Sequence, residues 1–410
     1  METLVVETFR SLRHPNFRLF FFGQIISLPG NWIQNIAMGW LVFRLTDSAF
    51  LLGVVGFASQ IPAFFVTPFA GVFADKLNRR NVLITTQITA MTIALGLAIL
   101  TLTDKITIPI IIIGAVINGI AFAIDNPFRH AFLVNIIDDR KDLPNAIALN
   151  STMFNSARFI GPPIGGFLVA VAGEGVCFLV NGLSYIAVVA SLLMMRTAPF
   201  VKVQSETSIF SDLISGIKYA FGTAHIRILI LVVIVVSLVG LPFQVFMPVF
   251  AKVILAGDSQ TLGFLTGALG AGALMGALLL ANQKSVSKFP NIIFSSSLMF
   301  SIGLGIFTLS HVFWISMVAL IITGFGMVAL FAACNTLLQT VVVENMRGRV
   351  VAFYSMSFMG FTPIGSFLIG SITEFAGVQT TLAVAAGLCL LIGFWYYRNM
   401  PVVKKSLLNF

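Results

Sequence analysis

Long apolar runs, separated by short connections rich in charged and turn-forming residues, follow one another along the whole chain. A helix needs roughly 20 apolar residues to cross the hydrocarbon of a bilayer, and these runs lack the alternation that strands show. The pattern therefore predicts an all-α polytopic membrane protein with twelve transmembrane helices. The spans are expected to begin near Leu19, Leu51, Asn81, Ile106, Asn145, Val176, Ile226, Leu262, Asn291, Trp314, Val350 and Thr380.

Composition and charge agree with this class. The 410 residues are 58% hydrophobic and only 10% charged, which no soluble protein of this length matches. Of the 24 Lys and Arg residues, 20 lie on one set of connections. Arg44, Lys105 and Lys252 lie on the other set, and Arg158 falls inside a span. Because cationic loops stay in the cytoplasm, both termini are expected there.

The net charge of +9 is spread over these connections, so it indicates orientation and contact with anionic membrane lipid rather than nucleic acid binding. Cys177, Cys334 and Cys389 lie in or beside apolar runs, and no Cys-x-x-Cys or His cluster occurs, so no metal site is expected. A nucleotide-binding Gly-Lys-Ser/Thr loop is also missing from the sequence. We therefore expect no cofactor and no enzyme. A sensor or scaffold would need a larger soluble domain than any connection provides.

The longest polar connection, residues 197–225, divides the spans six and six. Within it, apolar residues recur at helical spacing and predict an amphipathic helix at the membrane interface. These residues are Phe210, Leu213, Ile214, Ile217 and Phe221. We expect an N-terminal six-helix bundle (1–196), this linker (197–225) and a C-terminal six-helix bundle (226–410).

An internal repeat supports the division into halves. Residues 161–166 read Gly-Pro-Pro-Ile-Gly-Gly, and residues 361–366 read Phe-Thr-Pro-Ile-Gly-Ser. Gly53 and Gly56 of the second span likewise recur as Gly263 and Gly267 of the eighth. Repeated halves around a midplane cavity are typical of secondary transporters.

Residues 71–80 read Gly-Val-Phe-Ala-Asp-Lys-Leu-Asn-Arg-Arg and lie between the second and third spans. This segment resembles the signature loop of the major facilitator superfamily, with Phe73 in place of Leu and Asn78 in place of the second Gly. Asn tolerates positive φ better than most residues, so the turn is compatible with the substitution. The resemblance implies the major facilitator fold, with two pseudo-symmetric six-helix bundles.

The same resemblance implies a gate at the cytoplasmic side. In it, Gly71 would allow close approach to the eleventh helix, while Asp75, Arg79 and Asp125 would form a charge relay. Spacing of four residues, from Asp75 to Arg79 and from Asp125 to Arg129, fits helical ion pairs. The alternative is ordinary solvation of helix ends. The predicted gate residues are Gly71, Asp75, Arg79, Arg80, Asp125 and Arg129.

The fifth span resembles the antiporter motif of the superfamily, in which Gly161, Pro162, Gly165 and Gly166 would bend a helix that packs against its pseudo-symmetric partner. The motif is associated with export, although Pro and Gly in a membrane helix also serve packing alone. Residues 9–20, 125–134 and 142–150 resemble a subfamily of bacterial exporters that includes enterobactin-type siderophore exporters and macrolide efflux proteins. This resemblance implies the bacterial cytoplasmic (inner) membrane.

Cargo contacts are expected from polar groups near the middle of the spans. Arg158 is the sharpest candidate, because a guanidinium there needs a polar cavity or a partner; it would bind an anionic oxygen or backbone carbonyls freed by Pro162. Amides also link helices without touching cargo. The predicted cargo-binding residues are Arg158, Gln34, Asn31, Asn35, Trp32, Asn118 and Tyr354.

Asp125 is the one carboxylate near a span interior and is therefore the candidate for proton coupling. We expect a secondary active exporter of a small organic molecule, siderophore-like or drug-like, working by proton antiport with alternating access. The alternatives are a multidrug or macrolide efflux pump and a lipid or lysolipid transporter. Twelve spans can form a complete monomer, so no partner subunit is expected.

Overall fold

The computed structural model describes residues 9–74, 76–196, 209–283 and 285–407, and these residues are helical without a strand. The long helices are α2 (Pro15–Thr46), α3 (Ala49–Phe73), α4 (Arg79–Leu102), α5 (Ile108–Asn135), α6 (Leu143–Met194), α10 (Ser259–Ala281), α11 (Phe289–Leu309), α12 (Phe313–Val341), α13 (Glu344–Ala376) and α14 (Val378–Ser406).

Helix α6 passes through the membrane region twice. Its 52 residues bend at Gly173, whose φ of 79° and ψ of 170° suit glycine and strain other residues. We call residues 143–172 the first limb of α6 and residues 174–194 its second limb. The bend accounts for the fifth and sixth predicted spans.

The seventh span is an irregular helix. It starts as α8 (Ala224–Val235) and continues through a π-helix (Val236–Gly240), a 3-10 helix (Leu241–Phe246), the short α9 (Met247–Val249) and a second π-helix (Phe250–Ile254). Pro242 and Pro248 cannot donate backbone hydrogen bonds, which explains why the regular pattern breaks here.

The prediction of twelve spans is confirmed. Ten helical segments are long and apolar enough to cross a membrane, with Arg140–Met194 counted once although it passes twice, and α2 is the remaining span. Predicted starts agree with the helices to within three residues except at α2 and α13. These two helices begin with polar turns, Pro15–Arg18 and Glu344–Arg349, which extend beyond the apolar run.

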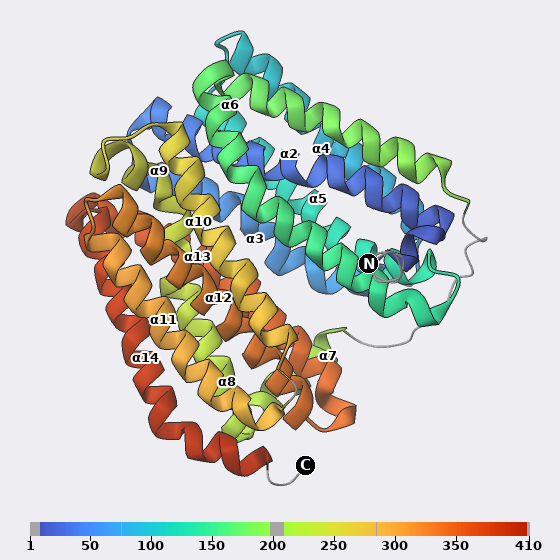
Figure 1. The fold of residues 1–410 in the computed structure, drawn as a ribbon, viewed down its shortest axis with the longest axis vertical. Helices are drawn as coiled ribbons and strands as arrows, with labels where there is room; N and C mark the ends of the chain where they lie inside the picture. Colours follow the sequence, from blue (N-terminus) through green and yellow to red (C-terminus); the bar gives the residue numbers. More distant parts are fainter. Residues whose placement is uncertain (1–8, 75, 197–208, 284, 408–410) are drawn as a thin grey trace, which may run out of the picture.

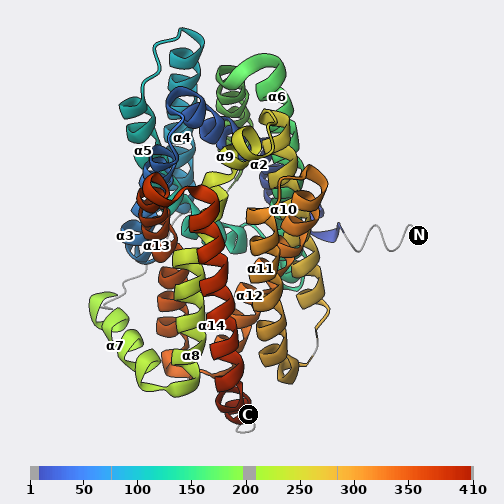
Figure 2. The ribbon, with the colours of Figure 1, turned by 90° about the vertical axis from the view of Figure 1, so that its left-hand side faces the viewer.

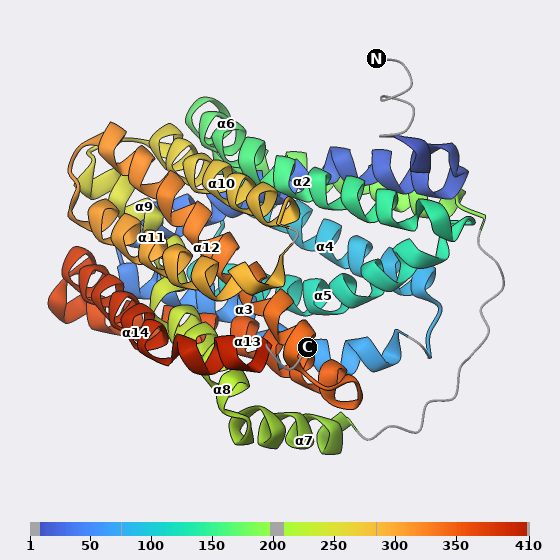
Figure 3. The same cartoon turned by 60° about the horizontal axis from the view of Figure 1, so that its bottom comes forward.

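The helices form two groups, α2 to α6 and α8 to α14, that meet at one end of the molecule and diverge toward the other (Figure 1). Helix α3 packs on α13, and α6 packs on α10, across the boundary between the groups. Gly53 lies against Ser366 and Gly370, and Gly166 lies against Ser259 and Gly263. We call the end with the turns at Asp47, Gly173 and Gly377 the closed end. The groups diverge toward the end where α2 begins and α14 ends (Figure 3).

A helix is present in the predicted linker. It is α7 (Ile209–Gly222), which lies beside α8 at the diverging end (Figure 2). It packs on α13, where Phe221 and Phe353 have ring centroids 5.9 Å apart. The side chains of Phe210 and Leu213, predicted for its apolar stripe, lie outside the described residues, as do residues 197–208.

Candidate functional site

The Arg158 side chain lies on the first limb of α6, with its guanidinium carbon 5.8 Å from the ring centroid of Trp32 on α2. Both side chains are half-buried. Within the described part of the chain the guanidinium makes no hydrogen bond and no ion pair. The alternative role considered from the sequence, a hydrogen bond from Arg158 to backbone carbonyls freed by Pro162, is therefore not seen among these residues. Arg158 also borders the second group of helices, since its carbonyl oxygen faces Gly270 of α10.

Two of the predicted amides are already engaged inside the first group. Asn181 donates to the Oε1 atom of Gln34 at 2.7 Å, and the Tyr185 hydroxyl donates to the Oδ1 atom of Asn31 at 2.5 Å. Both donors lie on the second limb of α6. Gln34 is 6% exposed, so its amide acts as a helix-packing group in this structure.

Two other predicted amides keep their hydrogen-bonding groups available. Asn35 on α2 is exposed and Asn118 on α5 is half-buried. Neither side chain makes a hydrogen bond to any described residue. Asn35 follows Trp32 by three residues, which places both on one face of α2. Trp32 thus lies beside Arg158 and on the same face of α2 as Asn35, and the role of these three residues in cargo binding stays a prediction.

Tyr354 on α13 has a different environment. Its ring is 8% exposed, and its hydroxyl donates to the backbone oxygen of Phe331 at 2.8 Å. The hydrogen bond joins α13 to α12 within the second group. The predicted role of Tyr354 in cargo binding stays a prediction.

Asp125 is held by three side chains in the interior of the first group. Thr86 and Gln87 of α4 donate to its Oδ1 atom at 3.0 and 2.8 Å, and Arg129 donates to Oδ2 through Nε at 2.8 Å and through Nη2. The carboxylate is 3% exposed. The predicted Asp125–Arg129 pair is therefore formed, and it is a buried ion pair.

The predicted gate is described only in part. Asp75 lies outside the described residues, as does the surrounding of Gly71, so the relay itself stays a prediction. Arg79 donates to the Ala74 oxygen at 2.8 Å and to Asn135 Oδ1 at 2.8 Å. Arg80 donates to the oxygens of Leu192 and Leu193, at the end of the second limb of α6.

The antiporter-like motif makes contacts that the resemblance did not imply. The expected partner of this fifth span was its pseudo-symmetric equivalent, the eleventh span, but α6 packs on α10, the eighth span. Gly166 lies against Gly263 and Pro163 against Gly267, both on α10, while Gly161 and Gly165 face Trp32 and Ile33 of α2. The two-fold pseudo-symmetry explains why the expected partner was wrong. It relates the fifth span to the eleventh and the second span to the eighth, so the contact between α6 and α10 is equivalent to the contact between α13 and α3.

An ion pair joins the two groups at the closed end. The Nζ atom of Lys252, in the second π-helix, lies 2.7 Å from the Oδ1 atom of Asp47, which ends α2. The ammonium also lies 5.2 Å from the ring centroid of Phe43. By contrast, the neighbouring pair of Arg44 and Glu174, at 2.7 Å, joins α2 to the bend of α6 within one group.

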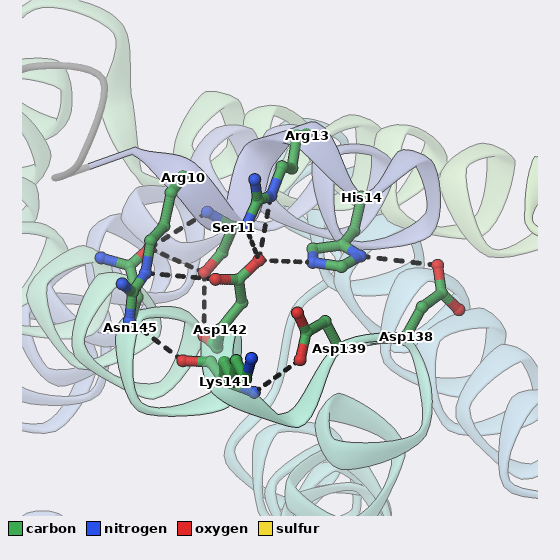
Figure 4. A network of polar contacts seen from close by, with 9 residues as sticks. All are labelled: Arg10, Ser11, Arg13, His14, Asp138, Asp139, Lys141, Asp142 and Asn145. Atoms are coloured by element: carbon green, nitrogen blue, oxygen red, sulfur yellow. Dashed lines mark hydrogen bonds and ion pairs between the residues drawn. The ribbon is translucent and has the colours of Figure 1, made fainter. Parts of the chain in front are cut away.

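At the diverging end, a network centred on Asp142 fixes the start of α2 to the start of α6 (Figure 4). Asp142 is 1% exposed. Its carboxylate lies 3.2 Å from Arg10, 2.8 Å from Arg13 and 2.9 Å from His14. The His14 ring also lies 3.4 Å from Asp138. Two segments that carried the family resemblance, residues 9–20 and 142–150, thus contact each other.

Sequence reasoning did not assign a role to Tyr185, Asn181 or the Lys252–Asp47 pair. One signal was present: Asn181, Ser184 and Tyr185 share one face of the sixth span by their spacing, and polar groups there need partners. For Lys252 no signal in the sequence names Asp47 as its partner, because the two lie in different halves.

Comparison with known proteins places the chain among transporters. The family model described as "Transmembrane secretion effector" matches residues 6–408. The chain is similar to the staphyloferrin A transporter of Staphylococcus aureus, with 26% identity over 94% of this chain and 97% of that protein. It is also similar to the multidrug efflux pump Tap of Mycolicibacterium fortuitum, with 24% identity over 92% and 93% of the two chains.

The fold is similar to that of a bacterial homologue of the human lysosomal transporter Spinster, whose crystal structure is in an inward-facing, unoccupied conformation. The TM-score is 0.73 at 13% sequence identity, covering 96% of this chain and 98% of the other. At this identity the likeness establishes the fold alone. It confirms the all-α, twelve-span architecture predicted from the sequence.

Proposed function

Since the chain belongs to the transmembrane secretion effector family of the major facilitator superfamily, we propose that it is a secondary active exporter of small organic molecules that carry anionic or polyhydroxylated groups. The observation that carries the proposal is the Arg158 guanidinium, which lies over the Trp32 ring, with its carbon 5.8 Å from the ring centroid, and has no polar partner in the described residues. A cation inside a membrane span costs several kcal/mol unless it faces a polar group, and a cargo oxygen would supply one.

Siderophores fit this chemistry, because their carboxylate, catecholate or hydroxamate oxygens accept bidentate hydrogen bonds from a guanidinium. The similarity to a staphyloferrin A transporter supports this class. A multidrug pump is the second candidate, supported by the similarity to Tap and by the aromatic face of Trp32. The two candidates differ in how strongly transport depends on the charge of Arg158.

Export would proceed by alternating access between the N-terminal bundle (1–196) and the C-terminal bundle (226–410), with residues 197–225 as the linker. The contacts between the bundles extend from the closed end, where Lys252 pairs with Asp47, to the level at which the Arg158 carbonyl faces Gly270. This supports a conformation open toward the end where α2 begins and α14 ends. With the termini in the cytoplasm of a bacterial cell, as the distribution of Lys and Arg favours, cargo would enter from the cytoplasm. No second copy of the chain is needed for this cycle.

The energy source we propose is an inward flow of protons, with Asp125 as the coupling group. A proton on Asp125 would weaken its bonds to Arg129, Thr86 and Gln87, so protonation and rearrangement of the first bundle would be linked. Asp125→Asn should abolish gradient-driven flux while normal amounts of protein reach the membrane. Retained driven flux would exclude Asp125 as the essential carrier.

The function is tested by mass spectrometry of medium and cell extract under iron limitation, comparing a deletion strain with strains that express the protein or Arg158→Gln. A chelator that the deletion strain retains and the wild-type protein releases would establish siderophore export. Arg158→Lys serves as the matched control, since it keeps the charge and loses the planar fork. If no chelator changes while ethidium accumulation does, the protein is a multidrug pump.

A further inference from the structure

The second limb of α6 presents three polar side chains to α2 along one face. Asn181 bonds Gln34, Tyr185 bonds Asn31, and the Ser184 and Ser27 hydroxyls are 3.2 Å apart. The α2 residues are spaced by four and three positions, so they form one stripe along the helix. Gly30 lies between them, and a Cβ there would meet Asn181 Oδ1 at 2.6 Å, so the two helices are in close contact.

The opposite limb of α6 holds the other side of α2. Gly161 faces the Cβ atom of Trp32, and Gly165 faces Ile33. Helix α2 is therefore enclosed by both limbs, and its rotation about its own axis decides where Trp32 lies. A rotation of one residue position, about 100°, would remove Trp32 from Arg158.

Tyr185 is the central group in this arrangement. Its ring is 4% exposed and packs against Ala90 and Ala94 of α4, so its hydroxyl has a fixed position. The 2.5 Å bond to Asn31 is one residue away from Trp32 along α2. A hydroxyl with so little freedom restricts the rotation of α2 at the level of the cargo site.

We infer that Tyr185, acting through Asn31, is a positioning residue of the cargo site: it fixes the rotation of α2 that brings Trp32 under the Arg158 guanidinium. Asn31, predicted from the sequence as a cargo ligand, is then a support of the site. The expected effect of Tyr185 on transport rests on the proposed function. The effect of Tyr185 on the position of Trp32 does not depend on any cargo.

The first test reads Trp32 directly. The chain has 4 tryptophans, and Trp40→Phe, Trp314→Phe and Trp395→Phe leave Trp32 as the one fluorescent indole. In this background, Tyr185→Phe should shift the Trp32 emission and raise its quenching by acrylamide. Tyr396→Phe is the matched control, because Tyr396 is also buried and its hydroxyl donates to the Pro290 oxygen within the second group. The control should leave Trp32 unchanged.

A double-mutant cycle tests the route through Asn31. Asn31→Ala should change the Trp32 signal as Tyr185→Phe does, and the double variant should change it no further, since both substitutions remove the same bond. Additive effects would overturn the inference, because they would show that Tyr185 acts elsewhere.

The second test uses transport of staphyloferrin A and, separately, of ethidium into inverted vesicles. Loss of one interhelical hydrogen bond should raise the KM by roughly threefold to tenfold with little change in the maximal rate. An unchanged Trp32 signal together with an unchanged KM would overturn the inference, as would equal effects of Tyr396→Phe. A changed Trp32 signal in a protein that moves neither probe would support the positioning role and reject the proposed function.

Discussion

The ion pair between Lys252 and Asp47 should bias the protein toward the conformation in which its closed end stays shut. The pair joins the two groups of helices at 2.7 Å, and the Lys252 ammonium also lies over Phe43. Asp47 and Lys252 are 73% and 36% exposed, so water screens their attraction. An exposed pair contributes about 0.2–1 kcal/mol and an exposed cation–π contact about 0.5–1 kcal/mol.

Together these contacts stabilise the closed end by about 0.7–2 kcal/mol, which corresponds to a factor of roughly 3–30 in a conformational equilibrium. Lys252→Gln removes both contacts without emptying the site. It should therefore raise the population that is open at this end by that factor. The Asp47→Lys, Lys252→Asp double variant should recover part of the ion pair and lose the contact with Phe43.

The assay is pulsed electron paramagnetic resonance between spin labels at Leu45 on α2 and Phe375 on α13, which are 42% and 91% exposed. Lys252→Gln should add a longer-distance population, and added salt should reduce its difference from wild type. Arg44→Gln is the control, since it removes a cation at the same end from a pair within one group. An unchanged distance distribution, or an equal change in the control, would refute the reasoning.

Three further substitutions test the packing. Asp142→Asn should lower the thermal stability of the purified protein, because it leaves Arg13 and His14 facing a neutral amide; an unchanged melting temperature would show that the network contributes nothing. Gly166→Ala places a methyl group against the backbone of Ser259 and should destabilise the closed end by about 1–3 kcal/mol, visible as a longer distance in the same resonance assay. Tyr354→Phe should cost about 0.6 kcal/mol of stability and leave the KM unchanged, since the hydroxyl already bonds the Phe331 oxygen; a raised KM would place Tyr354 in the cargo site.

The spans could be predicted from the sequence because the bilayer imposes their length and composition directly. The apolar run that begins near Ile106 and the polar turn before it, for example, predict the start of α5, which the structure places at Ile108, without reference to any other helix. The predicted starts of α2 and α13 were wrong by more than three residues, because each helix begins before its apolar run, with Pro15–Arg18 and Glu344–Arg349. Hydropathy predicts which residues lie in the apolar part of the membrane, but it does not predict the residue at which a helix begins or ends.

The partners of the polar residues could not be predicted in the same way. Asn31, Gln34 and Arg158 look alike in the sequence, since each is a polar residue that lipid would reject. Which of them meets another helix depends on how the helices are rotated against each other, and ridges and grooves of apolar side chains decide that rotation. Tyr185 and Asn181 satisfy the two amides, and Arg158 meets an aromatic face instead.

The two halves of the molecule differ in how firmly they hold the helix nearest the cargo site. Helix α2 is tied to α6 at its start by the Asp142 network, midway by the Tyr185 bond and at its end by the Arg44–Glu174 pair. The seventh span, which carries Lys252, contains two π-helices and a 3-10 segment and is the irregular element in the described residues. Irregular turns change conformation with less loss of regular hydrogen bonding than an intact α-helix does.

This difference predicts which half of the molecule changes conformation during alternating access. If the first half moves as one body, the Trp32–Arg158 pair keeps its geometry through the cycle, and the cargo site is carried on a fixed platform. We then expect Lys252 to separate from Asp47 through a change in the backbone conformation of the second π-helix, residues 250–254. Distance changes on opening should accordingly be larger between labels within the second half than between labels on α2 and α6.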